Sequence, residues 1–165
     1  MEGRTVTEST VMMAHEMRPQ DANAAGNVHG GTIMKLIETA AGVVAKRHAQ
    51  GNVVTASVDR LDFYHPVYVG EFLTLRACLN HVGRTSMEVG VRVEAEKPAT
   101  GERKHTSTAY LTFVALDEQG RPRLLPPLIM ETSEQQRRNR EAEARRVTRL
   151  AEKTREKEIP PDPTD

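Results

Sequence analysis

Residues 21–38 read DANAAGNVHGGTIMKLIE, a run of turn formers that passes directly into an apolar helical pattern. Glycines interrupt regular structure and Thr32 stands near the start of the pattern, which therefore predicts a helix from about Gly31 to His48. At roughly 100° per residue, one stripe of this helix carries the apolar side chains of Ile33, Leu36, Ile37, Ala40, Val43 and Val44. We expect that stripe to face the core.

A second flank of the same helix carries a single carboxylate. Glu38 falls roughly 140° from Ile33 in the helical projection. Its neighbours on this flank are Met34, Ala41 and Ala45. Because Glu38 points away from the core stripe, this flank could meet another subunit.

The remainder of the first 130 residues has the two-residue period of strands. A first signal covers residues 5–17, and four more cover residues 53–63, 71–81, 86–96 and 104–116. The short connectors between the last three suit antiparallel hairpins. The order strand, helix, four strands predicts an α+β fold, in which an antiparallel sheet packs one face on the helix. The other face is left to water or to further elements.

Composition excludes several classes of partner. The 165 residues suffice for one domain, and 23 basic side chains balance 23 acidic ones. A net charge of zero gives no general electrostatic reason to bind nucleic acid or an anionic membrane. Cys78 has no partner in the chain for a disulfide, which suits a reducing compartment, and no apolar run reaches the ~18 residues that span a bilayer. We therefore expect a soluble, cytoplasmic protein.

The charges are spread unevenly along the chain. Residues 1–130 hold 14 basic and 14 acidic side chains, whereas the much shorter segment 131–165 holds 9 of each. Large apolar residues are rare in that segment, so it cannot build a core of its own. We expect a domain over residues 1–130 and a charged helical tail over 131–165, with a helix at about 134–157 and a disordered end at 159–165.

The predicted helix start gathers groups that catalysis could use. It offers unpaired backbone N–H groups with a partial positive charge, and glycines let a substrate atom approach that backbone. Asn27, His29 and Glu38 add an amide, an imidazole and a carboxylate. Donors beside a base suit acyl transfer, in which an oxyanion forms and a water is deprotonated. The alternative is structural: the glycines only shape a turn, and Glu38 is a solvated helix residue.

Spacing excludes other kinds of site. Gly26, Gly30 and Gly31 fit neither the phosphate-binding P-loop nor the dinucleotide fingerprint. No second His or Cys stands at zinc-ligand spacing from His29, and there is no Gly-x-Ser-x-Gly elbow. We therefore expect no metal.

Residues 21–38 resemble a known family, the hotdog-fold acyl-CoA thioesterases, and within it the cytosolic acyl-CoA hydrolases of the brain type. Further matches follow in order along the chain. They are Val53 to Asp59, Asp62-Phe63, Val69 to Glu71, Ser86 to Val89, and Leu125 to Thr132. The resemblance covers about residues 6–155.

This resemblance implies a hotdog fold, in which a five-stranded antiparallel sheet wraps around one long helix and two such units pair. It also implies a homodimer at least, assembled further into a trimer of dimers, with acyl-CoA as the substrate and no cofactor besides the CoA of that substrate. The family's catalytic pair falls here on Asn27 and Glu38, contributed by opposite units. Relatives often carry Asp at the second position, which is one methylene shorter.

By resemblance, the reaction is hydrolysis of acyl-CoA to a free fatty acid and CoA. Backbone N–H groups near Gly30 and Gly31 would polarise the thioester carbonyl, and Glu38 would activate water as a general base. His29 could contact the substrate, or make a structural hydrogen bond in the turn.

The resemblance also implies a contact for the CoA arm at a hairpin further along the chain. Its residues are Arg84, Thr85 and Ser86, and Arg84 could pair with a phosphate. The alternative is a solvated turn.

Two other functions fit the same fold. The first is a non-catalytic acyl-CoA-binding sensor, against which the presence of both Asn27 and Glu38 argues. The second is a dehydratase or hydratase, whose His and acid stand in a different motif. Thioester hydrolysis is therefore the predicted activity.

Overall fold

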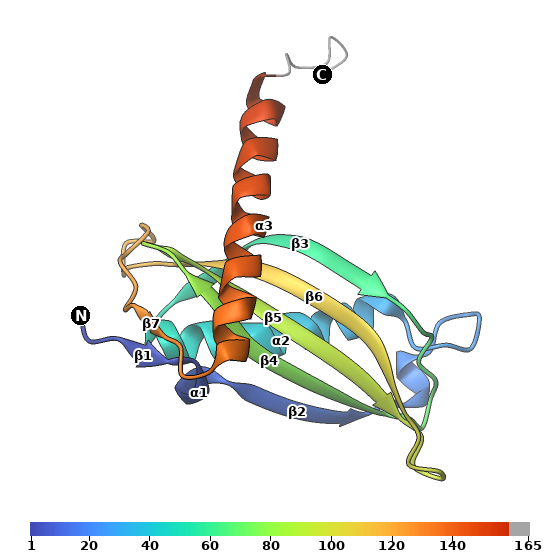
Figure 1. Cartoon of the computed structure of the whole chain (residues 1–165). Coiled ribbons are helices and arrows are strands. Elements are labelled where there is room, and N and C mark those ends of the chain that lie inside the picture. The colour runs from blue at the N-terminus through green and yellow to red at the C-terminus, as the bar shows by residue number, and fades with distance from the viewer. Residues whose placement is uncertain (159–165) are drawn as a thin grey trace.

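The computed structural model of the protein describes residues 1–158. Figure 1 traces its elements in chain order. They are β1 (Arg4–Thr5), α1 (Val6–Ser9), β2 (Val11–Glu16), a 3-10 turn (Pro19–Asp21), α2 (Gly30–Ala49), β3 (Val53–Phe63), β4 (Phe72–Val82), β5 (Ser86–Glu96), β6 (Arg103–Ala115), β7 (Leu128–Ile129) and α3 (Ser133–Glu158).

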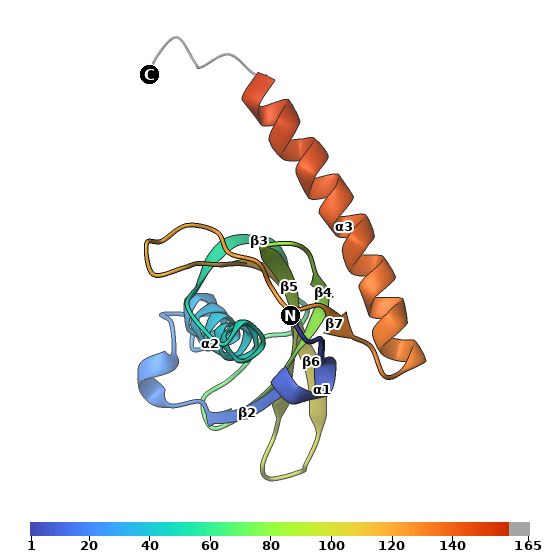
Figure 2. The same ribbon diagram turned by 90° about the vertical axis from the view of Figure 1, so that its left-hand side faces the viewer.

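Five strands form one antiparallel sheet in the order β2-β4-β5-β6-β3. The sheet curves around α2, which lies in its concave side (Figure 2). Apart from the first expected strand, the strand and helix boundaries differ from the expected ones by a residue or two, and the α+β prediction of one helix against a five-stranded sheet is confirmed. Strand β3 lies at one edge of the sheet, and β2 lies at the other.

The beginning of the chain differs from the expected strand over residues 5–17. Residues Val6–Ser9 instead form the short helix α1, because Thr5 and Glu8 make a capping box. The Thr5 Oγ1 accepts the Glu8 N–H at 3.3 Å, and the Glu8 carboxylate accepts the Thr5 N–H at 2.5 Å. The extended strand begins only at Val11, and β1 pairs in parallel with the short β7.

The core lies between α2 and the inner face of the sheet. The predicted core stripe of α2 packs there, with Ile33, Ile37 and Val44 each at most 3% exposed. Ala41 and Ala45 are also fully buried in this core. Half of the flank that could have met another subunit is therefore used within the chain, and its other two members, Glu38 and Met34, stay exposed.

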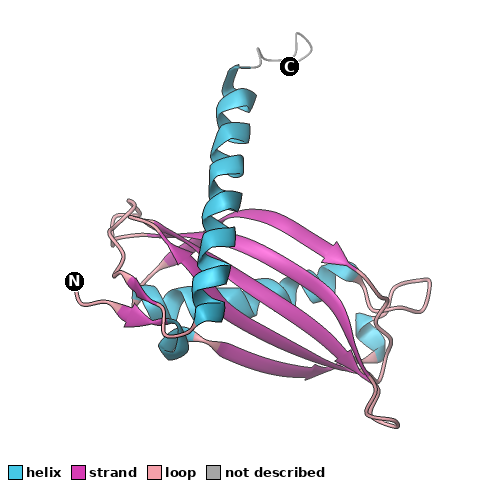
Figure 3. Ribbon diagram, viewed as in Figure 1, coloured by secondary structure: helices cyan, strands magenta, loops and turns pink. Residues whose placement is uncertain are grey.

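Helix α3 crosses the outer face of the sheet and then projects past the β3 edge (Figures 1 and 3). Ala142, a residue of α3, is fully buried. Arg145 binds the buried carboxylate of Glu88 at 2.7 Å, and Arg149 pairs with Asp59. The predicted charged helix is thus present, held by ion pairs more than by apolar contact. The predicted disorder at 159–165 lies outside the described residues.

None of the helices within residues 1–158 combines the length and the apolar character that crossing a bilayer requires.

Candidate active site

Two loops meet at the N-terminal end of α2. The His29 N–H donates to the Asp21 carbonyl at 2.7 Å, and the Val28 N–H donates to the Val67 carbonyl at 2.8 Å. Asn27 makes an antiparallel bridge with Tyr68. The segment before the helix is therefore fixed on the segment after β3.

Asn23 organises the turn between these anchors. Its Oδ1 accepts the Ala25 N–H at 2.9 Å and the Asn27 N–H at 3.3 Å, and its own N–H donates to the Asn27 carbonyl at 2.7 Å. Gly26 has φ of +87°, which favours glycine at this point of the turn. Since the Asn23 oxygen is engaged by the loop, its NH₂ group is the part of the amide that a ligand could use.

His29 is the N-cap residue of α2. Its Nδ1 accepts the Gly31 N–H at 3.0 Å. Of the two roles predicted for His29, substrate contact or a structural hydrogen bond in the turn, the structure shows the hydrogen bond. The same bond engages one of the two N–H groups expected to polarise a substrate carbonyl. Gly30 lines a small cavity of about 250 Å³ together with Asn27 and Phe63. Gly30 is thus the better placed of the two glycines to meet a ligand.

Glu38 lies two turns into α2, exposed, and pairs with the first part of β3. The Thr55 hydroxyl donates to Glu38 Oε1 at 2.9 Å. A hydroxyl donor fixes one oxygen of the carboxylate and leaves the second free to accept a proton. The carboxylate is therefore oriented on the surface of the single chain, next to the open edge of the sheet.

The loop amides and Glu38 do not meet within one chain. Eight residues of helix separate Gly30 from Glu38, which corresponds to about 12 Å of rise. Within residues 1–158 no hydrogen bond joins Asn23 or Asn27 to Glu38. The described chain therefore does not bring these groups together into one site.

The hairpin residues Arg84, Thr85 and Ser86 lie at the other end of the molecule, where α2 ends. The Leu125 N–H donates to the Arg84 carbonyl, and the Ala115 N–H donates to the Thr85 carbonyl, both at 2.9 Å. These bonds fix the hairpin to the end of β6 and the segment after it. The structure therefore does not bring this hairpin together with Asn27 or Glu38 in one chain.

Metal ligation has no support in the described part of the chain. No group of three or more His, Cys, Asp or Glu side chains within residues 1–158 is arranged to hold a metal ion.

Comparison with known proteins identifies the family. The family model described as the thioesterase superfamily matches residues 25–102. The chain is 39% identical, over 134 residues, to an uncharacterized acyl-CoA thioester hydrolase of Bacillus subtilis, covering 81% of this chain and 78% of that protein. It is 35% identical, over 146 residues, to the mouse cytosolic acyl coenzyme A thioester hydrolase, covering 87% of this chain but only 38% of that protein. The chain thus spans about two fifths of the length of this mammalian relative.

Solved structures give the same result. An apo-hexameric acyl-CoA thioesterase superposes with a TM-score of 0.89 at 38% identity, covering 92% of this chain and 97% of that one. A Staphylococcus aureus acyl-CoA hydrolase in complex with butyryl coenzyme A and coenzyme A superposes with a TM-score of 0.87 at 32% identity, covering 93% and 94%.

Alanine variants of the Staphylococcus aureus enzyme have also been solved. One replaces an asparagine, another an aspartate fifteen residues further along, and a third a threonine another seventeen residues along. Taken with the identity to the Bacillus relative over most of both chains, these comparisons show that the chain belongs to the thioesterase superfamily and has its hotdog fold.

Proposed function

We propose that this protein hydrolyses acyl-CoA thioesters to a free fatty acid and CoA. The observation that carries the proposal is the oriented carboxylate of Glu38, held by Thr55 on the open flank of α2. The names of relatives similar over most of this chain support it, since they are acyl-CoA thioester hydrolases. Acyl-CoA is the substrate, and the reaction needs no cofactor besides the CoA that the substrate contains.

Glu38 acts as the general base. Its free oxygen takes a proton from water while the water oxygen attacks the thioester carbonyl carbon. The carbonyl electrons move onto oxygen, which the Gly30 N–H and a loop amide stabilise. When the oxyanion collapses, the carbon–sulfur bond breaks and CoA leaves as a thiolate, which takes the proton that Glu38 removed from water and so restores the carboxylate base. Glu38 is longer than Asp by one methylene, and the Thr55 hydroxyl limits where its carboxylate can lie.

The loop amide of the mechanism is supplied by Asn23 or by Asn27. Asn27, the residue on which the resemblance placed this role, lines the cavity beside Gly30. Asn23, however, stands fifteen residues before Glu38, and Thr55 stands seventeen after it. The same intervals separate the three substituted residues of the Staphylococcus aureus hydrolase. We therefore assign the amide role to Asn23, and we assign to Asn27 the shaping of the cavity.

The sequence pattern alone did not single out Asn23 and Thr55. Asn23 looks like an ordinary turn residue, and Thr55 looks like one of several β-branched residues in a strand. Thr55 is identified as a candidate site residue only from the structure, in which its hydroxyl donates to Glu38.

The active form is a homo-oligomer, because about 12 Å of helical rise separates Gly30 from Glu38, which is too far for the two to act on one thioester within one chain. We propose a dimer as the minimal unit and a hexamer, as a trimer of dimers, as the full assembly. The hexameric state of similar thioesterases supports this. Cytoplasmic location is part of the same proposal, supported by the cytosolic name of the mammalian relative.

A panel of acyl-CoA substrates tests the proposal, with release of free CoA as the readout. We expect Asn23→Ala to lower kcat by about 10- to 1000-fold, and Asn27→Ala to change it by less. A larger loss in Asn27→Ala would return the amide role to Asn27. Saturable binding of acyl-CoA without any turnover by the wild-type protein would replace the proposal by the sensor alternative.

A further inference from the structure

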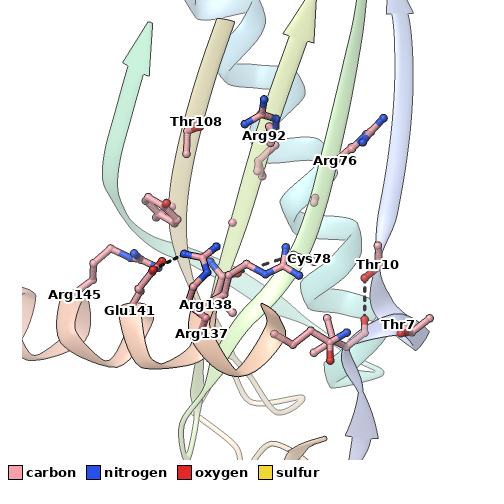
Figure 4. A pocket seen from close by; sticks show the side chains of 17 residues that line it. Thr7, Thr10, Arg76, Cys78, Arg92, Thr108, Arg137, Arg138, Glu141 and Arg145 are labelled. Atoms are coloured by element: carbon pink, nitrogen blue, oxygen red, sulfur yellow. Dashed lines mark hydrogen bonds and ion pairs between the residues drawn. The ribbon is translucent and has the colours of Figure 1, made fainter. Parts of the chain in front are cut away.

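The outer face of the sheet carries a second and larger cavity. It lies between strands β4, β5 and β6 and the first turns of α3, with a volume of about 630 Å³. Figure 4 shows arginine side chains gathered from the strands and from the helix around this space. The lining arginines are Arg76, Arg92, Arg137, Arg138 and Arg145, and Glu141 is the one carboxylate that lines it within residues 1–158. We call this cavity the outer hollow.

The outer hollow is deep over the sheet because two of the strand residues that line it, Cys78 and Gly90, are small. Arg76 on β4 is directly opposite Arg92 on β5, and the next pair on the same face of the sheet is Cys78 with Gly90. A Cβ atom at Gly90 would lie only 2.6 Å from the Asn80 Nδ2. Glycine at this position therefore leaves room for the Asn80 side chain, whose amide donates to the buried Glu88 at 3.0 Å.

Two of the five arginines are fully occupied by carboxylates. Arg137 pairs with Glu134 at 2.6 Å and also with Glu141. Arg145 binds the buried Glu88 at 2.7 Å, and its guanidinium lies 3.8 Å from the centre of the Tyr110 ring. These two belong to the contacts that hold α3.

The other three arginines are poorly compensated. Arg76 and Arg92 stand directly opposite each other on neighbouring strands, and like charges in that position destabilise a sheet. They share the carboxylate of Glu94, at 3.9 Å and 3.3 Å. The Arg138 Nε is buried with no hydrogen-bond partner in the described chain, 3.9 Å from the nearest Glu134 oxygen. One hollow thus collects donors that the described side chains do not satisfy.

We propose that the outer hollow binds a compact anion that carries a diphosphate group. Guanidinium forks match phosphate oxygens in geometry as well as in charge, and three of them around one space suit more than one phosphoryl group. The volume falls within the range of small-molecule sites, roughly 300–1000 Å³. The Thr108 hydroxyl and the Gln135 amide also line the hollow and can accept or donate further bonds.

The sheet separates the outer hollow from α2, so the proposal of a diphosphate site does not rest on the proposed hydrolysis. The diphosphate can have two sources. It can belong to a free metabolite, or to the nucleotide arm of a CoA molecule whose acyl end lies in another subunit.

Calorimetric titration of the full-length protein with inorganic diphosphate tests the proposal. We expect saturable binding to the wild-type protein, and weakening by at least ~10-fold in the double variant Arg76→Gln/Arg92→Gln, since each charged hydrogen bond contributes substantially to binding. Arg138→Gln should weaken binding as well, and it serves if the double variant does not fold. The matched control is Arg103→Gln, which removes an exposed arginine that pairs with Glu96 outside the hollow.

The controls separate this site from the catalytic one. Glu38→Gln should bind diphosphate as the wild-type protein does, whatever its hydrolytic rate. Displacement of diphosphate by free CoA would identify the CoA arm as the source, and independent binding would identify a free ligand; both uphold diphosphate recognition. Absence of saturable binding to the wild-type protein, or equal affinity in Arg76→Gln/Arg92→Gln and Arg103→Gln, would overturn the proposal.

Discussion

The two faces of the sheet hold their helices differently. The inner face packs on α2 through side chains that are almost all apolar. The outer face holds α3 through ion pairs near Ala142, a buried residue of that helix. Ile37 on α2 is 1% exposed. On α3, Val147 is 67% exposed and Leu150 is 47% exposed. Burial of apolar area supplies most folding energy, so α2 is part of the folded core and α3 is an addition to it.

The same difference separates two kinds of chemistry. The inner helix exposes one oriented carboxylate, Glu38, on a flank that is otherwise mostly buried. The outer helix brings several arginines over the sheet. We therefore expect changes to the α2 contacts to unfold the protein, and changes to the α3 contacts to release one helix.

The largest effect on stability should come from the inner helix. Ile37→Ala removes buried methylene groups from the centre of the core and leaves a cavity, which costs about 2–5 kcal/mol of unfolding free energy. Denaturant unfolding followed by circular dichroism measures this cost. The exposed neighbour Met34→Ala, at 44% exposure, is the matched control and should cost much less. Equal losses in the two variants would contradict the assignment of the core stripe.

A smaller effect should follow from breaking the contact that holds the outer helix. Arg145→Ala leaves the carboxylate of Glu88 buried, with the Asn80 amide at 3.0 Å as its one remaining partner within residues 1–158. Because Arg145 is partly exposed, we expect a cost of about 1–3 kcal/mol. Hydrogen exchange should show the loss in α3 while the amides of α2 keep their protection.

The double variant Glu88→Met/Arg145→Met tests whether the loss in Arg145→Ala comes from the unpaired carboxylate of Glu88. An apolar pair of similar size can replace a buried ion pair without loss, so protection of α3 should return towards the wild-type level. If the amides of α2 also lost protection in Arg145→Ala, the two helices would unfold together. That result would contradict the view that α3 is an addition to a core built on α2.

The smallest effect concerns the C-terminal end of α2. His48 is 1% exposed, its Nε2–H donates to the Pro126 carbonyl at 2.9 Å, and burial lowers the pKa of its imidazole. A lowered pKa means that the folded state favours the neutral ring. The stability from this ring is present above the ordinary pKa of about 6.5 and is lost as the pH falls through the lower pKa of the folded state.

The measurement is the unfolding free energy between pH 7 and pH 5. His48→Gln keeps an N–H donor for Pro126 and removes the titration, so its stability should fall less steeply with acid than that of the wild-type protein. Parallel curves for the two proteins would contradict this role of His48.

The fold was largely predictable from the sequence because helical and strand periods are local signals. The stripe from Ile33 to Val44 and the alternation in residues 86–96 each fix an element without knowledge of its neighbours. The start of the chain was not predictable in the same way, because one capping box between Thr5 and Glu8 turned part of an expected strand into a helix.

The candidate site was predictable only in part. Glu38 stood out because a carboxylate on a flank of small and apolar residues is unusual. Its partner Thr55 is seventeen residues away, and only the packing of β3 beside α2 joins them. The outer hollow is lined by residues from three strands and from α3, which is distant in the sequence. A local sequence pattern therefore cannot predict it.

The most direct test of the central claim is the rate of acyl-CoA hydrolysis by Glu38→Gln beside that of the wild-type protein. Glutamine keeps the size of the side chain and can still accept the Thr55 hydrogen bond, but it cannot take a proton from water. We expect kcat to fall by about 10²–10⁴-fold, with the oligomeric state and the unfolding midpoint unchanged. A rate within a few-fold of wild type would show that Glu38 is not the base and would contradict the account.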